Sequence, residues 1–108
     1  MDQSQIREDV RRFAAKVQAA LPVRQIILFG SYVHGTPHEF SDIDVAVITE
    51  SPVERWLDTA AELYRLREDI NIDIEPLLFD SEEDPSGFLA EIRRTGEIIY
   101  DREAEQAA

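Results

Sequence analysis

The sequence predicts an α/β (α+β) domain in which a small mixed β-sheet is flanked by helices. Stretches with apolar residues at helical spacing alternate along the chain with short apolar or alternating stretches that are typical of strands. The chain has 108 residues, near the most common domain size, and 44% of them are hydrophobic, which is enough for one core. No internal repeat or linker divides it. We therefore expect one domain over residues 1–100.

The first half of the chain is predicted to contain a helix and two strands. Residues 4–21 carry an amphipathic pattern that ends at Pro22, with its basic residues on solvated faces. Residues 24–29 form an apolar strand that stops at glycine, and residues 42–48 alternate like a second strand. The linker between them should begin as a helical turn and continue as a loop, with His34 and His38 on its surface.

The next helix and strand are predicted from a cap and a proline. Ser51 to Glu54 have the form of a capping box, so we expect a helix from there to about residue 68, with Trp56 and Tyr64 in the core. Residues 71–79 then form a strand, which Pro76 places at an edge of the sheet because proline cannot donate to a ladder.

The last part of the chain is predicted to contain one helix and one strand. Asp84 and Pro85 mark the start of the helix, which should turn Phe88 inward and end at Gly96. Glu97 to Tyr100 form a short strand or extended segment, and residues 101–108 should be a frayed, flexible tail.

Two acids form the centre of a candidate site. Asp42 and Asp44 are two residues apart on a predicted strand, so their side chains project from the same face. Carboxylates aimed together raise each other's pKa unless a cation lies between them. Mg²⁺ takes oxygen ligands and commonly binds carboxylates together with substrate phosphates. The pair therefore predicts a divalent metal and a phosphorylated substrate.

A Gly-Ser pair, separated from Asp42 by ten residues, completes the pattern. Gly30 lets the backbone turn sharply and approach a ligand closely, and Ser31 offers a hydroxyl and a backbone N–H at the start of a short helix. We expect this pair to bind phosphate. Either half of the pattern alone is common in turns, but the two together beside apolar strands indicate a site.

A third carboxylate is predicted on the strand over residues 71–79. Ile72 and Ile74 should point to one side of the sheet, and Asp73 and Glu75 to the other, beside the first two acids. The sequence does not separate Asp73 from Glu75, although it slightly favours Asp73.

Composition excludes several classes of protein. The net charge of −12 argues against binding along a nucleic-acid backbone and favours a protein or small molecule as partner. The absence of cysteine excludes disulfides and thiolate zinc sites. No apolar run approaches about 20 residues and the N-terminus lacks a signal-peptide pattern, so we expect a cytoplasmic protein without a membrane segment.

One stretch of the chain resembles the signature of the minimal nucleotidyltransferases (MNT) of the DNA polymerase β-like superfamily. The residues that carry the resemblance are Gly30 and Ser31, a ten-residue spacer containing Gly35, and Ser41, Asp42, Ile43 and Asp44. The order of the predicted elements fits over roughly residues 5–100. The resemblance implies the polymerase β-like fold and transfer of a nucleotide.

The resemblance also implies a role for each candidate residue. Gly30 and Ser31 would hold the β and γ phosphates of a nucleoside triphosphate, and Asp42 and Asp44 would bind two Mg²⁺ ions. Asp73 or Glu75 would complete the metal site and take the proton from the acceptor hydroxyl.

Small proteins of this kind are similar to the antitoxins of HEPN/MNT toxin–antitoxin pairs. That similarity implies a type VII-like antitoxin, associated with its toxin, that uses ATP to adenylylate a tyrosine of a HEPN ribonuclease and so silences it. Two alternatives stay open: a non-catalytic antitoxin that acts by occlusion, and a nucleotidyltransferase acting on a small molecule.

Overall fold

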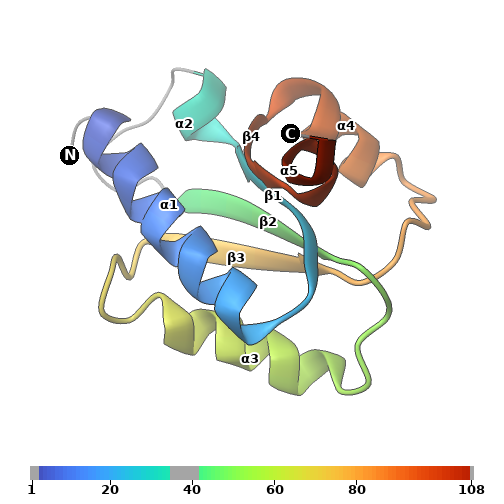
Figure 1. Ribbon diagram of the computed structural model, residues 1–108. Coiled ribbons are helices and arrows are strands. Elements are labelled where there is room, and N and C mark those ends of the chain that lie inside the picture. Colours follow the sequence, from blue (N-terminus) through green and yellow to red (C-terminus); the bar gives the residue numbers. More distant parts are fainter. Residues whose placement is uncertain (1–2, 35–41, 108) are drawn as a thin grey trace.

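Helices and strands alternate along the chain in the computed structural model, which describes residues 3–34 and 42–107 (Figure 1). The elements are α1 (Gln3–Ala20), β1 (Val23–Phe29), α2 (Ser31–His34), β2 (Ile43–Thr49), α3 (Trp56–Leu66), β3 (Ile74–Phe79), α4 (Phe88–Thr95), β4 (Glu97–Asp101) and α5 (Arg102–Ala107). The strands form one sheet in the order β3-β2-β1-β4. Because β1 runs antiparallel to β2 and β4 while β2 and β3 are parallel, the sheet is mixed, as predicted.

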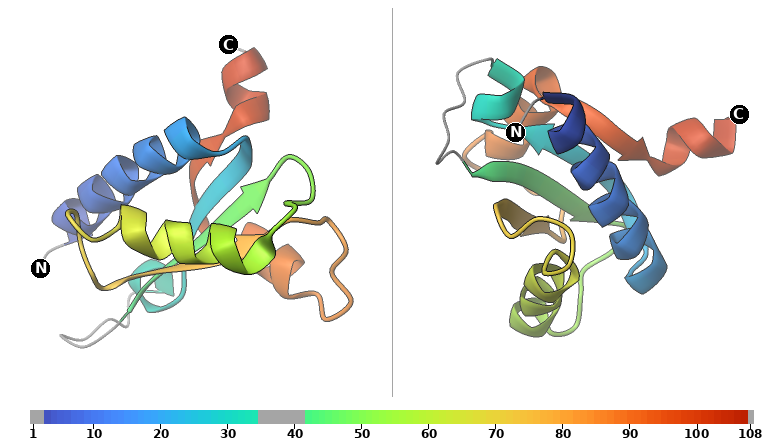
Figure 2. Two further views of the ribbon diagram at one scale, coloured as in Figure 1. Left: turned by 90° about the horizontal axis from the view of Figure 1, so that it is seen from below. Right: turned by 90° about the vertical axis from the view of Figure 1, so that its left-hand side faces the viewer.

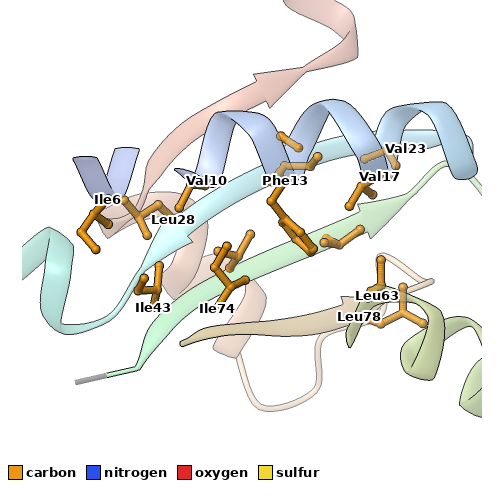
Figure 3. Packing of buried hydrophobic residues seen from close by; sticks show 14 residues of the cluster. Ile6, Val10, Phe13, Val17, Val23, Leu28, Ile43, Leu63, Ile74 and Leu78 are labelled. Carbon is orange, nitrogen blue, oxygen red and sulfur yellow. The ribbon is translucent and has the colours of Figure 1, made fainter. Parts of the chain in front are cut away.

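Helices cover both faces of the sheet, with α1 and α3 on one face and α4 on the other (Figure 2). Apolar side chains of α1, among them Phe13, pack on β1, β2 and β3 in the larger core cluster (Figure 3). Alternation along β2 sends Val45 and Val47 to this cluster and Ala46 and Ile48 to the smaller one under α4. Burial of each large aliphatic side chain stabilises the fold by roughly 1.5–3 kcal/mol.

Several predictions from sequence pattern are confirmed. The apolar stripe of α1 is buried, and this helix ends two residues before Pro22. Pro76 lies in β3, which is an edge strand. Asp84 accepts hydrogen bonds from the backbone N–H groups of Leu89 and Ala90, both at 2.9 Å, but α4 begins at Phe88, later than the start predicted at Asp84 and Pro85.

The predicted start of α3 is wrong, and so is the prediction that Trp56 and Tyr64 lie in the core. The helix begins at Trp56, and its N-cap residue Arg55 makes no capping bond. The Val53 N–H instead donates to Asp80 Oδ2 at 3.2 Å, directly after β3. Trp56 is 42% exposed and Tyr64 is 37% exposed, whereas Leu63 of the same helix is buried.

A helix occupies residues 102–107, where we expected a tail, and it projects from the body of the molecule (Figure 2). The Glu103 N–H donates to Asp101 Oδ1 at 2.9 Å, which satisfies a free N–H group at the start of α5. Ion pairs of Arg24 with Glu103 and of Arg102 with Glu50 join the helix to the neighbouring strands. None of the helices within the described ranges combines the length and apolar character needed to cross a bilayer.

Candidate active site

Three acids gather in one pocket near the C-terminal end of β1. Asp42 directly precedes β2, Asp44 lies in β2, and Glu75 is the register partner of Asp44 on β3. All three line a pocket of about 310 Å³. Asp42 and Asp44 therefore share a face of the sheet, as their spacing predicted. The remaining lining residues are Phe29, Tyr64, Pro76, Leu77 and Phe88.

Glu75, and not Asp73, joins the paired acids. Asp73 precedes β3 in a turn, where its N–H donates to Asn71 Oδ1 at 2.9 Å. The same Asn71 side chain donates to the buried Asp9 of α1 at 3.1 Å, which holds the turn against the core. The strand thus begins later than predicted. Ile72, expected to face inward, is 68% exposed.

Gly30 lies in a sharp turn, as predicted, and packs against Asp44, whereas its predicted approach to a phosphate stays a prediction. Its φ is +81°, a conformation that favours glycine. A Cβ atom at this position would lie 2.2 Å from Asp44 Oδ2. Ser31 follows directly as the first residue of α2. Ser41, Gly35 and His38 lie outside the described residues, so their predicted roles stay predictions.

The acids repel one another in this pocket. Burial raises the pKa of Asp44 above its ordinary value, and the charges of Asp42 and Glu75 raise it further. A divalent cation fits this arrangement, because it would remove the repulsion between the carboxylates. Within residues 3–34 and 42–107, no three acidic or histidine side chains are close enough to hold a metal by themselves. Two carboxylates suffice for Mg²⁺, which takes its other ligands from water and substrate phosphates.

Tyr64 and Arg67 of the α3 region also belong to the site, and sequence reasoning missed them. The Tyr64 hydroxyl donates a hydrogen bond to Glu75 Oε2 at 2.9 Å, which raises the pKa of this tyrosine. Arg67 Nη1 lies 4.0 Å from Glu75 Oε1. The spacing of three residues indicated that Tyr64 and Arg67 share a helix face, but it did not indicate which strand they meet.

Phe88 forms an apolar wall of the pocket. It is 47% exposed, although the helical pattern predicted that it faces inward. Its ring makes edge contacts with Phe29 and Phe79, at centroid distances of 6.0 and 6.2 Å. The pocket thus has an acidic side and an aromatic side.

The mixed sheet and the acids on its neighbouring strands, beside a Gly-Ser turn, define a domain of the nucleotidyltransferase class. Residues 12–105 match the family model described as "Polymerase beta, Nucleotidyltransferase", which covers most of the chain. The protein therefore belongs to the polymerase β nucleotidyltransferase family. A comparison with curated proteins found no matching sequence.

Solved structures share this fold at low sequence identity. A protein from Sulfolobus solfataricus that is assigned as a nucleotidyltransferase is 16% identical, with a TM-score of 0.69 over 94% of this chain and 85% of that one. A toxin–antitoxin structure with AMP-PNP is 22% identical, with a TM-score of 0.57 over 99% and 79% of the two chains. A tri-AMPylated Shewanella oneidensis HEPN toxin in complex with MNT antitoxin gives 19% identity and a TM-score of 0.56 over 98% and 78%.

Gly30→Ala should destabilise the protein more than Gly87→Ala, as measured by denaturant unfolding. Both glycines have positive φ, at 81° and 77°, so alanine at either position costs about 1–2 kcal/mol of backbone strain. A Cβ at Gly87 meets nothing within 4 Å, whereas one at Gly30 collides with Asp44. Equal losses in the two variants would contradict the close packing of Gly30 on the carboxylate.

Asp44→Asn should raise the thermal unfolding midpoint at neutral pH. The pKa of Asp44 is higher in the folded protein than in the unfolded chain. Its ionised form therefore destabilises the folded state, and this cost develops as the pH rises from the pKa of the unfolded chain through that of the folded protein. The gain should therefore vanish at pH values below the ordinary aspartate pKa of about 3.9. Asp58→Asn, which removes an exposed carboxylate of α3, is the matched control for net charge. A midpoint that rises equally in both variants would speak against local repulsion.

Proposed function

We propose that this protein is a Mg²⁺-dependent adenylyltransferase that transfers AMP from ATP to a tyrosine hydroxyl of a HEPN-type toxin, and so acts as an antitoxin. The observation that carries the proposal is the meeting of Asp42, Asp44 and Glu75 in one pocket, beside Gly30, in a chain of this family. The AMP-PNP and the tri-AMPylated HEPN toxin in structures of the same fold support the choice of donor and acceptor.

The acids and the Gly-Ser turn each have a role in this reaction. Gly30 and Ser31 bind the β and γ phosphates, and Asp42 and Asp44 hold the metal. Mg²⁺ held there would supply positive charge against the phosphates and would lower the pKa of the acceptor hydroxyl. Glu75 takes the proton from that hydroxyl as it attacks the α-phosphorus, and pyrophosphate leaves.

The charge of the protein is consistent with a protein acceptor. At a net charge of −12, the surface repels nucleic acid and attracts a basic protein. We expect the partner to present a basic face around the tyrosine that it delivers to the pocket. We also expect the two chains to form a complex, and this complex to be cytoplasmic. Salt should weaken this association because screening reduces the attraction between exposed charges.

Transfer can be tested with ATP labelled at the α-phosphate, Mg²⁺ and a HEPN-type toxin. We expect label on a toxin tyrosine and loss of its ribonuclease activity. The double variant Asp42→Asn with Asp44→Asn should transfer no label while keeping a cooperative unfolding transition, since it lacks the carboxylates that hold the metal. Binding of the toxin without label would instead indicate occlusion, and label on a small molecule would indicate a different acceptor.

Glu75→Gln should lower the rate of transfer by roughly 10²–10⁴-fold, the usual contribution of a general base. Asp73→Asn should transfer at close to the wild-type rate, because Asp73 is held in the turn before β3 and does not line the pocket. The rates are compared in single-turnover assays with excess protein. A large loss in Asp73→Asn with a small one in Glu75→Gln would reverse this assignment.

A further inference from the structure

One hydroxyl group of the protein itself already lies among the acids. Tyr64 lines the same pocket as Asp42, Asp44 and Glu75, and its Oη donates to Glu75 Oε2 at 2.9 Å. The tyrosine reaches this position from α3, outside the Gly-Ser and Asp pattern. The mechanism proposed above does not use it.

The phenol ring of Tyr64 is held in place. The guanidinium of Arg67 lies over the ring, 4.7 Å from its centroid. Arg67 is fixed in turn by hydrogen bonds from Nη1 to the carbonyl groups of Ile72 and Ile74, at 2.5 and 2.8 Å. With 37% of its surface exposed, Tyr64 also remains accessible from the pocket side.

This geometry meets the requirement for a reacting hydroxyl. A neutral phenol is a weak nucleophile, and general-base activation requires a basic atom within hydrogen-bond distance of the phenol oxygen, about 2.6–3.2 Å. Glu75, the group proposed to accept the proton of the acceptor, is within this distance of Tyr64. A tyrosine that is fixed beside the base loses little further freedom on reaction.

We propose that Tyr64 is an acceptor of its own protein's nucleotidyl group, so that the chain adenylylates itself. The inference rests on the proposed function. Tyr64 Oη forms a bond to the α-phosphorus of ATP, and the bond from this phosphorus to the oxygen that bridges to the β-phosphate breaks. Pyrophosphate leaves with the electron pair, and the phenol proton passes to Glu75 and then to solvent. Nothing is oxidised or reduced.

Self-modification would also regulate the site. A tyrosine esterified to AMP can no longer donate its hydrogen bond to Glu75, and the added nucleotide occupies the pocket that an external tyrosine must enter. Tyr64 and the toxin tyrosine therefore compete for the same base. Addition of the toxin should lower the yield of modified Tyr64.

The test uses the purified full chain alone with Mg²⁺ and ATP. Intact mass should increase by one AMP group per chain, and peptide fragmentation should locate it on Tyr64. Label at the α-phosphate of ATP should be retained, and label at the γ-phosphate should not. Tyr64→Phe should lose the modification. Tyr100→Phe is the matched control, since it removes the hydroxyl of a tyrosine on β4, at the far edge of the sheet, and should keep the modification.

A second measurement does not depend on turnover. A crystal structure of the chain with Mg²⁺ and α,β-methylene ATP should show Tyr64 Oη facing the α-phosphorus, on the side opposite to the methylene group. An oxygen turned away from the phosphorus would overturn the inference.

The outcomes separate this inference from the proposed function. If the wild-type chain labels the toxin but never itself, the inference is wrong and the proposed function stands. Undiminished labelling of Tyr64→Phe, or label on another residue, would likewise overturn it. If neither the toxin nor the chain is labelled, both proposals are wrong.

Discussion

The site depends on the parallel register between β2 and β3, which sets Asp44 opposite Glu75. Like charges at opposed positions of neighbouring strands destabilise a sheet. The packing on the other face of the same strands offsets this cost, because Ile43, Val45 and Ile74 are fully buried there. The strands are held together by apolar contacts on one side and carry the repelling acids on the other.

The end of β1 depends on the same constraint. Phe29 is the register partner of Asp44, so the chain must turn at the next residue against the carboxylate. A Cβ atom there would lie 2.2 Å from Asp44 Oδ2, so glycine is the residue that fits without displacing this carboxylate. The turn that brings Ser31 to the site and the acid that gives the site its charge are thus parts of one packed arrangement.

The edge of the sheet supplies the rest of the site. β3 has β2 as its one neighbour in the sheet, and the α3 region packs along it, so Tyr64 and Arg67 reach Glu75. On the other side, Phe88 at the start of α4 bounds the pocket. The acids therefore lie between two helices that are distant in sequence, and both helices contribute side chains to the pocket.

The sequence by itself determined the alternation of helices and strands, the edge position of Pro76 and the shared face of Asp42 and Asp44. These features follow from periodicity and from the geometry of single residues, which act within a few positions of the chain. The Gly30 turn was predictable for the same reason. The contact of Gly30 with Asp44 was not predictable from the sequence.

Only the tertiary structure decided which acid joins the pair and which side chains surround it. Asp73 is excluded because Asn71 bonds to Asp9, which lies 62 residues earlier on α1. The start of α3 moves because Val53 bonds to Asp80 rather than to its own turn. Tyr64 and Phe88 line the pocket because of where their helices pack. Contacts between distant segments set all these positions, and no local pattern records such contacts.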